Sequence, residues 1–361
     1  MPRAAATFLL GLALVLCGGL FDAEPLFVPG AAFVALAAGS LLWVRLAARG
    51  ATVQRTLSAA RVQEDEPLTV RLQADAGRLP FPGGTLEEPL LGDQPASLPA
   101  GRPAARIEVQ ARFARRGRRT LPAPRLVLRD PLGLASRVAG GDGAADEILV
   151  LPRVFPVPAA GGGDEHAAGH ARALLSGAAE VDLDGLRPYR PGAPASRIHW
   201  AALARGAGLL ERRLRPEGDG RPLVVLDTRA PAAPEDLDAA VRAAASLVVA
   251  LAAGGGCSAL LPGDRRAVRI APDLGAWPAL HARLAVVTER QGPPALAGAA
   301  ARAGTVIYVA ARAGAVPRGL AAIGGRRVLV SPGALGERPA AFAVAGCRGF
   351  VLGGRTAAEA A

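Results

Sequence analysis

Two long apolar stretches open the chain, and a short polar turn separates them. Residues 4–21 and 26–44 contain no charged side chain, and the turn Asp22–Pro25 holds two acids. A helix of about 17–25 apolar residues crosses the hydrocarbon core of a bilayer and satisfies its own backbone hydrogen bonds there. The pattern therefore predicts a transmembrane hairpin within residues 1–50, with spans of about 4–21 and 26–46.

The charges that flank these stretches predict the orientation of the hairpin. Arg3 precedes the first stretch, Arg45, Arg49 and Arg55 follow the second, and the turn between them holds only acids. Arginine-rich flanks stay on the cytoplasmic side of a membrane. We therefore expect a multi-pass protein of the plasma membrane whose residues 50–361 are cytoplasmic.

A secretory signal peptide is the alternative for the first stretch. The start is basic, the middle is apolar, and "LVLC" resembles a lipoprotein cleavage site. However, bulky Leu16 precedes Cys17 where a small residue is expected, and a second apolar stretch follows at once. These two features favour a membrane anchor.

Residues 51–155 change to the alternating pattern of half-buried strands. Short runs of alternating apolar and polar residues recur between segments rich in Pro and Gly, which predicts an antiparallel β-sandwich of about 100 residues. The segment "DPLGL", Asp130–Leu134, is expected to form a turn between strands, with Gly133 at a position of unusual φ. The predicted strands lie within residues 53–62, 67–76, 106–113, 125–130 and 147–154.

Residues 156–183 have the composition of a flexible linker, with the run "PAAGGGDEHAAGHAR". His166 and His170 are four residues apart, as in a helical metal pair. The glycines weaken a helix there, and only Asp164 and Glu165 lie close as further ligands. We expect a solvated linker rather than a metal site.

Residues 219–361 alternate between apolar strands and helices. This pattern predicts a doubly wound α/β domain, with a parallel sheet covered by helices on both faces. Ligands of such sheets bind at the carboxyl ends of the strands, and Asp227 ends the first strand. The strands are expected at 221–229, 257–262, 305–311, 326–331 and 349–353, and the helices at 235–255 and 276–287.

Arginine alone carries the positive charge of the chain. The net charge is +11, yet the 361 residues include no Lys and no Asn, a bias typical of a high-GC bacterial genome. No basic stripe is interleaved with stacking aromatics, so we expect a solvated arginine-rich surface and no nucleic-acid partner. The absence of Lys excludes a P-loop, a protein kinase and Schiff-base chemistry, and no GxSxG or HExxH motif occurs. We therefore do not expect an enzyme.

Three cysteines occur in the chain, at Cys17, Cys257 and Cys347. They are too few and too scattered to make a disulfide framework. We expect them to be free thiols in a reducing compartment.

The segment 184–218 gathers aromatic and guanidinium groups. It contains "GLRPYRPGAPASRIHWAALAR", in a chain whose aromatic residues amount to only 4%. Its prolines stiffen the backbone, and Ser196 is expected to cap a short helix that reaches about Ala204. The candidate binding or interdomain residues are Arg187, Tyr189, Arg190, Pro191, Gly192, Arg197, His199, Trp200 and Arg205.

Three roles for this segment stay open at this stage. In the first, the arginines pair with Asp182, Asp184 and Glu211 and lock two domains together, with Tyr189 and Trp200 in a core. Leu203 is also expected to point into a core. In the second, the arginines bind an acidic partner or a phosphate. In the third, His199 takes part in catalysis, although no acid that would orient it lies nearby in the sequence.

The order of these features resembles the DUF58 family of bacterial proteins over essentially the whole chain. Two N-terminal spans, a β-rich segment with "DPLGL", the segment "GLRPYRPG…RIHW…AR" and a strand ending in Asp carry the resemblance. The resemblance implies a C-terminal domain similar to a von Willebrand factor A domain. It also implies a MoxR-type AAA+ ATPase as partner, beside the lipid bilayer and other membrane proteins.

Two positions depart from the pattern of that family. Its members usually have Asp directly after "PG", but Ala193 follows Gly192 here. A metal-competent A domain ends its first strand in Asp-x-Ser-x-Ser, whose oxygens hold Mg²⁺. This chain has instead the run Asp227-Thr228-Arg229-Ala230-Pro231.

The changed motif predicts a site without a metal cofactor. Hard divalent ions such as Mg²⁺ need oxygen ligands, and the Arg side chain has none. We expect that Arg229 pairs with Asp227 and stands in for the charge of the metal. The alternative is that Arg229 simply points to solvent.

These features favour a non-enzymatic membrane adaptor of the DUF58 type. The hairpin would anchor it, and its cytoplasmic domains would work with the MoxR-type ATPase. One alternative is a metal-assisted enzyme that uses Asp227 and His199. The other is a basic domain that binds the anionic inner leaflet. The missing Lys and the degenerate metal motif favour the adaptor.

Overall fold

The computed structural model divides the chain into two compact units. The β unit comprises Met1–Ala114 and Arg118–Val150, and the α/β unit comprises Arg115–Gly117 and Leu151–Ala361. The structure describes residues 2–92, 95–141, 143–157, 186–188, 200–206, 208–212, 221–289, 294–300, 303–314, 316–321, 323 and 326–352.

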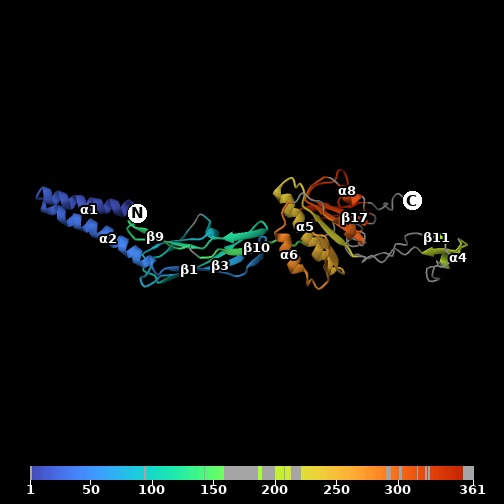
Figure 1. Ribbon diagram of the computed structural model, residues 1–361, viewed down its shortest axis with the longest axis horizontal. Coiled ribbons are helices and arrows are strands. Elements are labelled where there is room, and N and C mark those ends of the chain that lie inside the picture. Colours follow the sequence, from blue (N-terminus) through green and yellow to red (C-terminus); the bar gives the residue numbers. More distant parts are fainter. Residues whose placement is uncertain are drawn as a thin grey trace. The chain divides into compact units, whose positions relative to one another are not determined.

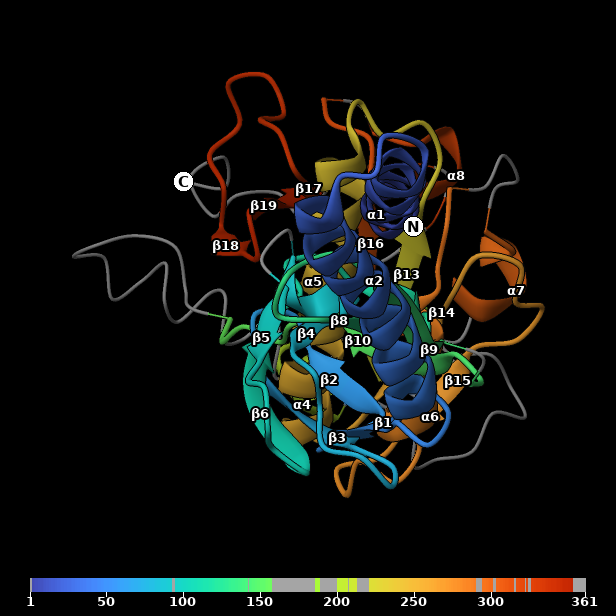
Figure 2. The same ribbon diagram turned by 90° about the vertical axis from the view of Figure 1, so that its left-hand side faces the viewer.

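Two helices form the predicted hairpin at the start of the β unit. Helix α1 spans Pro2–Leu20, and α2 spans Phe27–Ala48 after the short 3₁₀ helix η1, Glu24–Leu26. The helices lie side by side (Figure 1 and Figure 2). They approach closely at Gly11 and Gly30, because a Cβ on Gly11 would lie 2.7 Å from the carbonyl oxygen of Gly30. Small residues permit such contacts between apolar helices.

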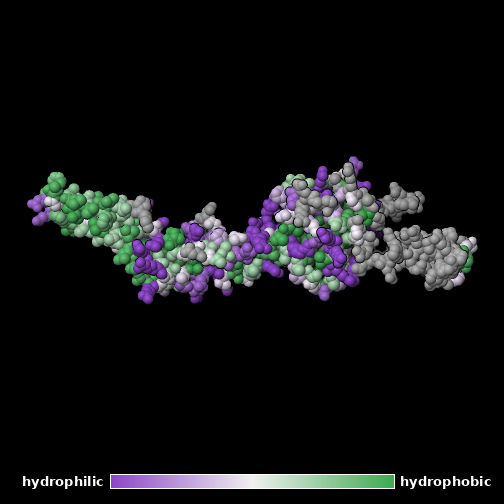
Figure 3. All heavy atoms as spheres, viewed as in Figure 1, coloured by the Kyte–Doolittle hydropathy of each residue, from purple (hydrophilic) through white to green (hydrophobic). Residues whose placement is uncertain are grey.

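Most apolar side chains of these helices are exposed. Only 17% of the segment Arg3–Leu20 and 22% of Glu24–Ala48 are buried. A core helix of a soluble protein would bury its apolar face. Figure 3 shows hydrophobic residues covering both helices on the visible face, and the most exposed, Leu20 and Val28, are 79% and 77% accessible. Both helices are long and apolar enough to cross a membrane.

The strands of the β unit form three sheets, with the orders β1-β3-β6, β2-β10-β7 and β5-β4-β8-β9. The neighbours within the first and third sheets pair antiparallel, as predicted. The sequence analysis missed β4, β5, β7 and β9, which have only three to five residues each. The bounds are β1 Thr52–Leu57, β2 Arg61–Gln63, β3 Leu68–Asp75, β4 Gly84–Glu87, η2 Pro89–Leu91, β5 Ala96–Leu98, β6 Ala104–Ala111, β7 Gly117–Leu121, β8 Arg125–Arg129, β9 Ser136–Gly140 and β10 Asp146–Leu151.

One hydrophobic core joins these sheets to the end of α2. Val44 and Ala47 of α2 lie in the same buried cluster as Leu72, Leu86 and Ile148 of the strands. Alternate side chains along a strand point to opposite faces, so the period-two pattern brings one apolar face of each strand into this core. The last turns of α2 therefore belong to the β unit, although the predicted second span reaches residue 46.

Arg55 is not the flanking surface charge that the sequence analysis assumed. It lies on β1, and its side chain is only 1% exposed. Its Nε donates to Asp146 at 2.8 Å and its Nη1 to Glu88 at 2.9 Å, while the carbonyl oxygens of Leu121 and Pro122 accept two further hydrogen bonds. Because these carboxylates neutralise the guanidinium inside the β unit, the predicted orientation rests on the other three arginines.

A seven-stranded sheet forms the centre of the α/β unit, in the order β15-β14-β13-β16-β17-β19-β18. The central strands β14, β13, β16 and β17 are parallel, as predicted. The outer strands pair antiparallel: the edge strand β15 with β14, β19 with β17, and the edge strand β18 with β19. The bounds are β13 Leu223–Asp227, α5 Pro234–Ala253, β14 Cys257–Leu260, β15 Val268–Ile270, α6 Trp277–Ala285, α7 Leu296–Ala300, β16 Thr305–Ala310, α8 Arg318–Ala321, β17 Arg326–Ser331, β18 Phe342–Val344 and β19 Cys347–Leu352.

The prediction of a wholly parallel sheet is therefore wrong for the strand expected at 349–353. This strand, β19, follows β18 through a two-residue turn, Ala345 and Gly346, both with positive φ. Such a turn makes a tight antiparallel hairpin. It returns the chain against β17 in the reverse direction.

Helices cover both faces of the sheet. Val224 and Leu226 of β13 belong to one buried cluster with α5 and α6, whereas Leu223 and Val225 belong to another with α7 and α8. The continuous apolar sequence of β13 therefore fills both sides. The chain places β14 on one side of β13 and β16 on the other, so the strand order reverses between β13 and β16.

Candidate functional site

The carboxyl ends of β13 and β16 meet at the point where the strand order reverses. Connections leave such a point in opposite directions, which opens a crevice where ligands of doubly wound sheets bind. Asp227, the last residue of β13, lies in register with Ala310, the last residue of β16. Tyr308 stands two residues earlier on β16. The topology therefore brings an acid and a phenol to the expected ligand-binding edge.

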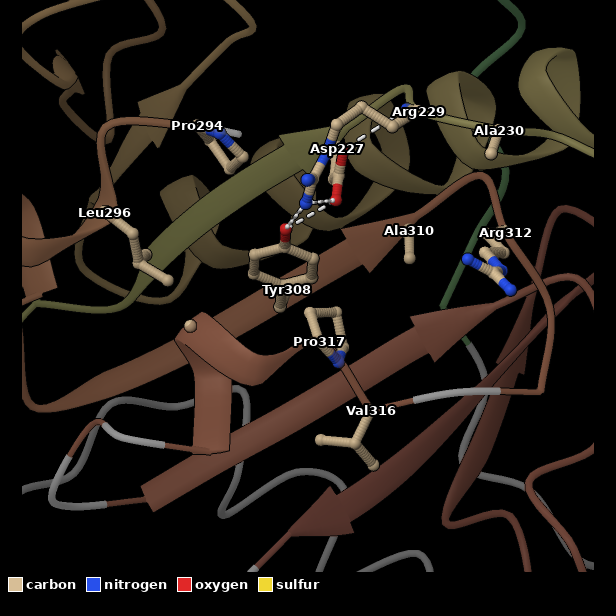
Figure 4. Close-up of a pocket in the computed structure, with 11 residues that line it drawn as sticks. Asp227, Arg229, Ala230, Pro294, Leu296, Tyr308, Ala310, Arg312, Val316 and Pro317 are labelled. Carbon is tan, nitrogen blue, oxygen red and sulfur yellow. Dashed lines mark hydrogen bonds and ion pairs between the residues drawn. The ribbon is translucent and has the colours of Figure 1, made fainter. Parts of the chain in front are cut away.

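Arg229 holds Asp227 through two parallel hydrogen bonds. Nε of Arg229 donates to Oδ1 at 2.8 Å, and Nη2 donates to Oδ2 at 2.7 Å. The backbone N–H of Arg229 also donates to Oδ1, at 3.1 Å. Figure 4 shows the guanidinium turned toward the carboxylate. The predicted pairing of these two residues is confirmed, and the alternative of a solvent-directed Arg229 is wrong.

Tyr308 completes a cluster of three side chains, which we call the Asp227 cluster. Its hydroxyl donates to Oδ2 of Asp227 at 2.6 Å and accepts a longer hydrogen bond from Nη2 of Arg229 at 3.5 Å. Tyr308 is 2% exposed and Asp227 is 6% exposed. Both oxygens of the buried carboxylate are thus satisfied by donors from two different elements.

The electrostatics of the Asp227 cluster fix its protonation. Burial raises the pKa of Asp227, but hydrogen bonds from Arg229 and Tyr308 outweigh burial and hold that pKa below its usual range. The hydrogen bond to Asp227 raises the pKa of Arg229, and burial raises the pKa of Tyr308. At neutral pH the acid is ionised and the phenol is protonated. The cluster is a fixed ion pair, poorly suited to general acid or base catalysis.

The turn that follows β13 stores strain. Ala230 has a φ of +45°, in the left-handed region that non-glycine residues rarely adopt. The hydroxyl of Thr228 is buried and has no hydrogen-bond partner. Each such feature costs about 1–3 kcal/mol, and strained backbone concentrates at functional sites. The turn keeps the guanidinium of Arg229 against Asp227 at this cost.

A pocket of about 650 Å³ opens beside the Asp227 cluster. Leu296 of α7, together with Val316 and Pro317 before α8, contributes apolar walls, and Arg312 adds a second, exposed cation just after β16. Figure 4 shows Arg312 on a different element from Arg229. The pocket can therefore accept an apolar group that carries a negative charge.

The donors of this site do not suit a divalent cation. Mg²⁺ takes oxygen ligands, but both oxygens of Asp227 already accept hydrogen bonds from Arg229 and Tyr308. Within the described part of the chain, no group of three or more His, Cys, Asp and Glu residues is arranged to hold a metal. A cation at Asp227 would have to displace the guanidinium of Arg229.

Only three pieces of the segment 184–218 are described. Strand β11, Leu186–Pro188, pairs antiparallel with β12, Leu210–Arg212, and places Arg187 opposite Glu211. Helix α4 spans Trp200–Ala204, so the predicted helix ends where expected. Six candidate residues lie outside the described part: Tyr189, Arg190, Pro191, Gly192, Arg197 and His199.

The prediction that Trp200 and Leu203 point into a core is wrong. They are 59% and 38% exposed, whereas Ala202 is 6% exposed. Residues three apart on a helix share one face, and on α4 that face is the outer one. Arg205 follows the helix directly and is exposed. The described part of this segment thus presents an exposed aromatic residue beside an arginine.

The remaining candidates from the sequence fall into two groups. The linker histidines His166 and His170 lie outside the described residues. The three cysteines are free, with Cys17 exposed and the other two buried. Burial raises the pKa of Cys257 and of Cys347 to about 12, so these thiols stay protonated and are poor nucleophiles.

Sequence reasoning missed Tyr308 and Arg312. A signal for Tyr308 was present, because it is the one residue with a polar group inside the buried run "VIYVAA". A buried tyrosine hydroxyl usually finds a hydrogen-bond partner. Its partner, Asp227, lies on a strand about 80 residues earlier, and only the order of strands in the sheet brings the two together.

Comparisons with known proteins found no relative of this chain. No family model, no curated protein and no solved structure matches this chain.

Proposed function

We propose that this chain is a membrane-anchored, non-enzymatic adaptor whose α/β unit binds a partner protein at the carboxyl edge of its sheet. The observation that carries the proposal is the Asp227 cluster at the mouth of the pocket. An ion pair with fixed protonation offers recognition but no acid, base or nucleophile. The exposed side of Arg229, the neighbouring Arg312 and the apolar walls suit an acidic side chain on an apolar peptide surface.

The two N-terminal helices support the anchoring half of the proposal. Their apolar side chains are largely exposed, and the close contact of Gly11 with Gly30 suits a helix pair in lipid. That contact also argues against a cleaved signal peptide, because removal of α1 would expose the face of α2 that it covers. The arginines at positions 3, 45 and 49 favour a cytoplasmic location for both units.

The resemblance to the DUF58 family suggests the identity of the partner. It implies that the α/β unit is similar to a von Willebrand factor A domain and that a MoxR-type AAA+ ATPase binds it. The doubly wound strand order and the aspartate at the reversal point agree with that resemblance. The exposed Trp200 beside Arg205 supplies a second surface for the same partner.

Affinity capture from native membranes tests this proposal. The tagged full-length chain is solubilised in mild detergent, and the proteins bound to it are identified by mass spectrometry. We expect a MoxR-type AAA+ ATPase to be enriched. We expect Arg312→Glu to abolish that enrichment, because it reverses a charge that lines the pocket without touching the ion pair.

Arg269→Glu is the matched control, because Arg269 is exposed on the edge strand β15 of the same unit. This variant should retain the ATPase. Equal enrichment with both variants would show that the pocket is not the docking site. Consistent absence of any ATPase with the unchanged chain would contradict the adaptor function itself.

A further inference from the structure

The turn between β8 and β9, residues Asp130–Ala135, packs against the two apolar helices. We call it the Asp130 turn. The carboxylate of Asp130 is 3% exposed, and its Oδ2 accepts a hydrogen bond from the hydroxyl of Ser40 on α2 at 3.3 Å. A Cβ built on Gly133 would lie 3.9 Å from Nη1 of Arg3, at the start of α1. The turn is thus bonded to α2 through Ser40 and lies near the basic end of α1.

Asp130 holds the two ends of the turn together and ties the turn to α2. Oδ1 of Asp130 accepts the N–H of Ala135 at 2.5 Å, and Oδ2 accepts the N–H of Leu132 at 3.1 Å. The N–H of Gly133 donates to the carbonyl of Asp130 at 3.0 Å, and the N–H of Asp130 donates to the carbonyl of Ala135 at 3.2 Å. These bonds satisfy both oxygens of the buried carboxylate and fix the turn against α2.

The outer surface of this turn is apolar. Leu132 at its tip is 63% exposed and Val138 on β9 is 55% exposed, and Pro131 is exposed as well. A single exposed leucine is ordinary on a protein surface. Here, however, the turn is bonded to α2 at Ser40, and α2 exposes apolar side chains before and after that residue, Leu36 at 46% and Leu42 at 58%.

The position of Ser40 along α2 sets the depth of the turn. Ser40 lies thirteen residues after Phe27, which is about 20 Å along a helix with a rise of 1.5 Å per residue. The hydrocarbon core of a bilayer is about 30 Å thick. If α2 enters the core near Phe27, Ser40 lies inside the opposite boundary of that core, and the long side chain of Arg3 near Gly133 would extend outward to the headgroups.

We infer that the Asp130 turn is a third membrane contact, with Leu132 inserted among the acyl chains of the leaflet that faces the soluble units. This inference rests on the proposed anchor and assigns a partner, lipid, to a surface outside the helices. Asp130 serves as an internal staple, because both oxygens of its carboxylate are bonded within the turn and Oδ2 also binds Ser40 of α2. The contact fixes the β unit against the bilayer surface, which a two-helix anchor alone does not achieve.

Quenching of a fluorescent label by spin-labelled lipids tests the depth of the turn. Three full-length chains, each with one cysteine, are reconstituted into vesicles in a background with Cys257→Ala and Cys347→Ala. The first keeps the native Cys17, which is exposed on α1. The second carries Cys17→Ala with Leu132→Cys, and the third carries Cys17→Ala with Ala59→Cys. Ala59 is exposed in the turn after β1, a strand that leads away from α2.

We expect lipid quenching at positions 17 and 132 and none at position 59. Val138→Cys is a second probe of the same surface and should show shallow quenching. Quenching at position 17 with none at 132 or 138 would overturn this inference and leave the anchor intact. No quenching at position 17 would overturn the anchor, and the inference with it.

Discussion

Each unit of this protein pairs an arginine with a buried carboxylate, but the two sites differ in how far they are closed to solvent. In the β unit the Arg55 cluster, Arg55 with Glu88 and Asp146, has a guanidinium that is 1% exposed. In the α/β unit the side chain of Arg229 remains 34% exposed beside a pocket. The same pair of chemical groups therefore stands once inside a core and once at the rim of a binding site.

The difference shows how to separate structural from functional ion pairs in an arginine-rich chain. All nitrogens of Arg55 are used by its two carboxylates and by carbonyl oxygens of the β unit. The Nε and Nη2 atoms of Arg229 donate to the carboxylate of Asp227. The side chain is still 34% exposed and lines the pocket. A closed pair stabilises a fold, whereas an open one also presents charge to a ligand.

The largest effect is expected from Arg55→Met. This change leaves Glu88 buried with no cation, and removal of one partner of a buried ion pair costs about 3–5 kcal/mol. We expect the free energy of unfolding of the β unit to fall by that amount. Amide hydrogen exchange of β1 and β3 across a urea series measures it in the full chain.

Arg71→Met provides the matched control in the same unit. Arg71 pairs with Glu108 on neighbouring strands at 3.3 Å, but the two side chains are 72% and 57% exposed. Exposed pairs contribute about 0–1 kcal/mol. Equal losses of stability in the two variants would contradict the structural role of the Arg55 cluster.

A smaller loss is expected from Arg229→Met. Asp227 would keep only Tyr308 as a side-chain donor, and leaving a buried acceptor short of its partner costs about 1–3 kcal/mol. Water can reach the site from the pocket, which limits the cost compared with Arg55. Exchange of the β13 amides measures the effect. Arg229→Lys should recover only part of the loss, since a lysine cannot make both parallel hydrogen bonds.

Tyr308→Phe should cost less again. It removes one hydrogen bond from Asp227 while leaving the ion pair, and a typical hydrogen bond contributes about 1 kcal/mol. The same exchange measurement on β13 and β16 detects it. A loss larger than that of Arg229→Met would mean that the phenol, not the guanidinium, holds the carboxylate.

The smallest expected effect is a change in how the free energy of unfolding of the α/β unit depends on pH in the acid range. Folding lowers the pKa of Asp227 below its ordinary value of 3.8. The stabilisation is therefore complete above that value and is lost as the pH falls from 3.8 through the pKa of the folded state. In Arg229→Met the pKa of Asp227 should rise, so that the variant loses less stability than the unchanged chain as the pH falls below 3.8. Urea midpoints of the unit at a series of pH values test the direction.

The sequence predicted most of the fold because its long elements have strong periodic patterns. The apolar helices α1 and α2, the alternating strands β3 and β6 and the central parallel strands were all expected. The short strands β4, β5, β15 and β18 were missed, because three or four residues are too few to show a period. Strand β19 was assigned the wrong direction, since an apolar run does not reveal which neighbour it joins.

The candidate site was predictable only as far as it is local. Asp227 and Arg229 are two residues apart, so an arginine at the first serine position of the Asp-x-Ser-x-Ser motif was enough to predict their pairing. Tyr308 and Arg312 come from β16 and the residues after it, and only the sheet topology brings them to the same edge. Arg55 was misjudged for the same reason, because its partners Glu88 and Asp146 lie far along the chain.

Titration calorimetry of the full chain with Mg²⁺ tests the central claim that a guanidinium takes the place of a metal at Asp227. We predict no saturable heat for the unchanged chain. The variant with both Arg229→Ser and Pro231→Ser, which restores oxygen donors beside Asp227, should bind the cation and serves as the positive control. Saturable micromolar binding by the unchanged chain that disappears in Asp227→Ala would contradict the account.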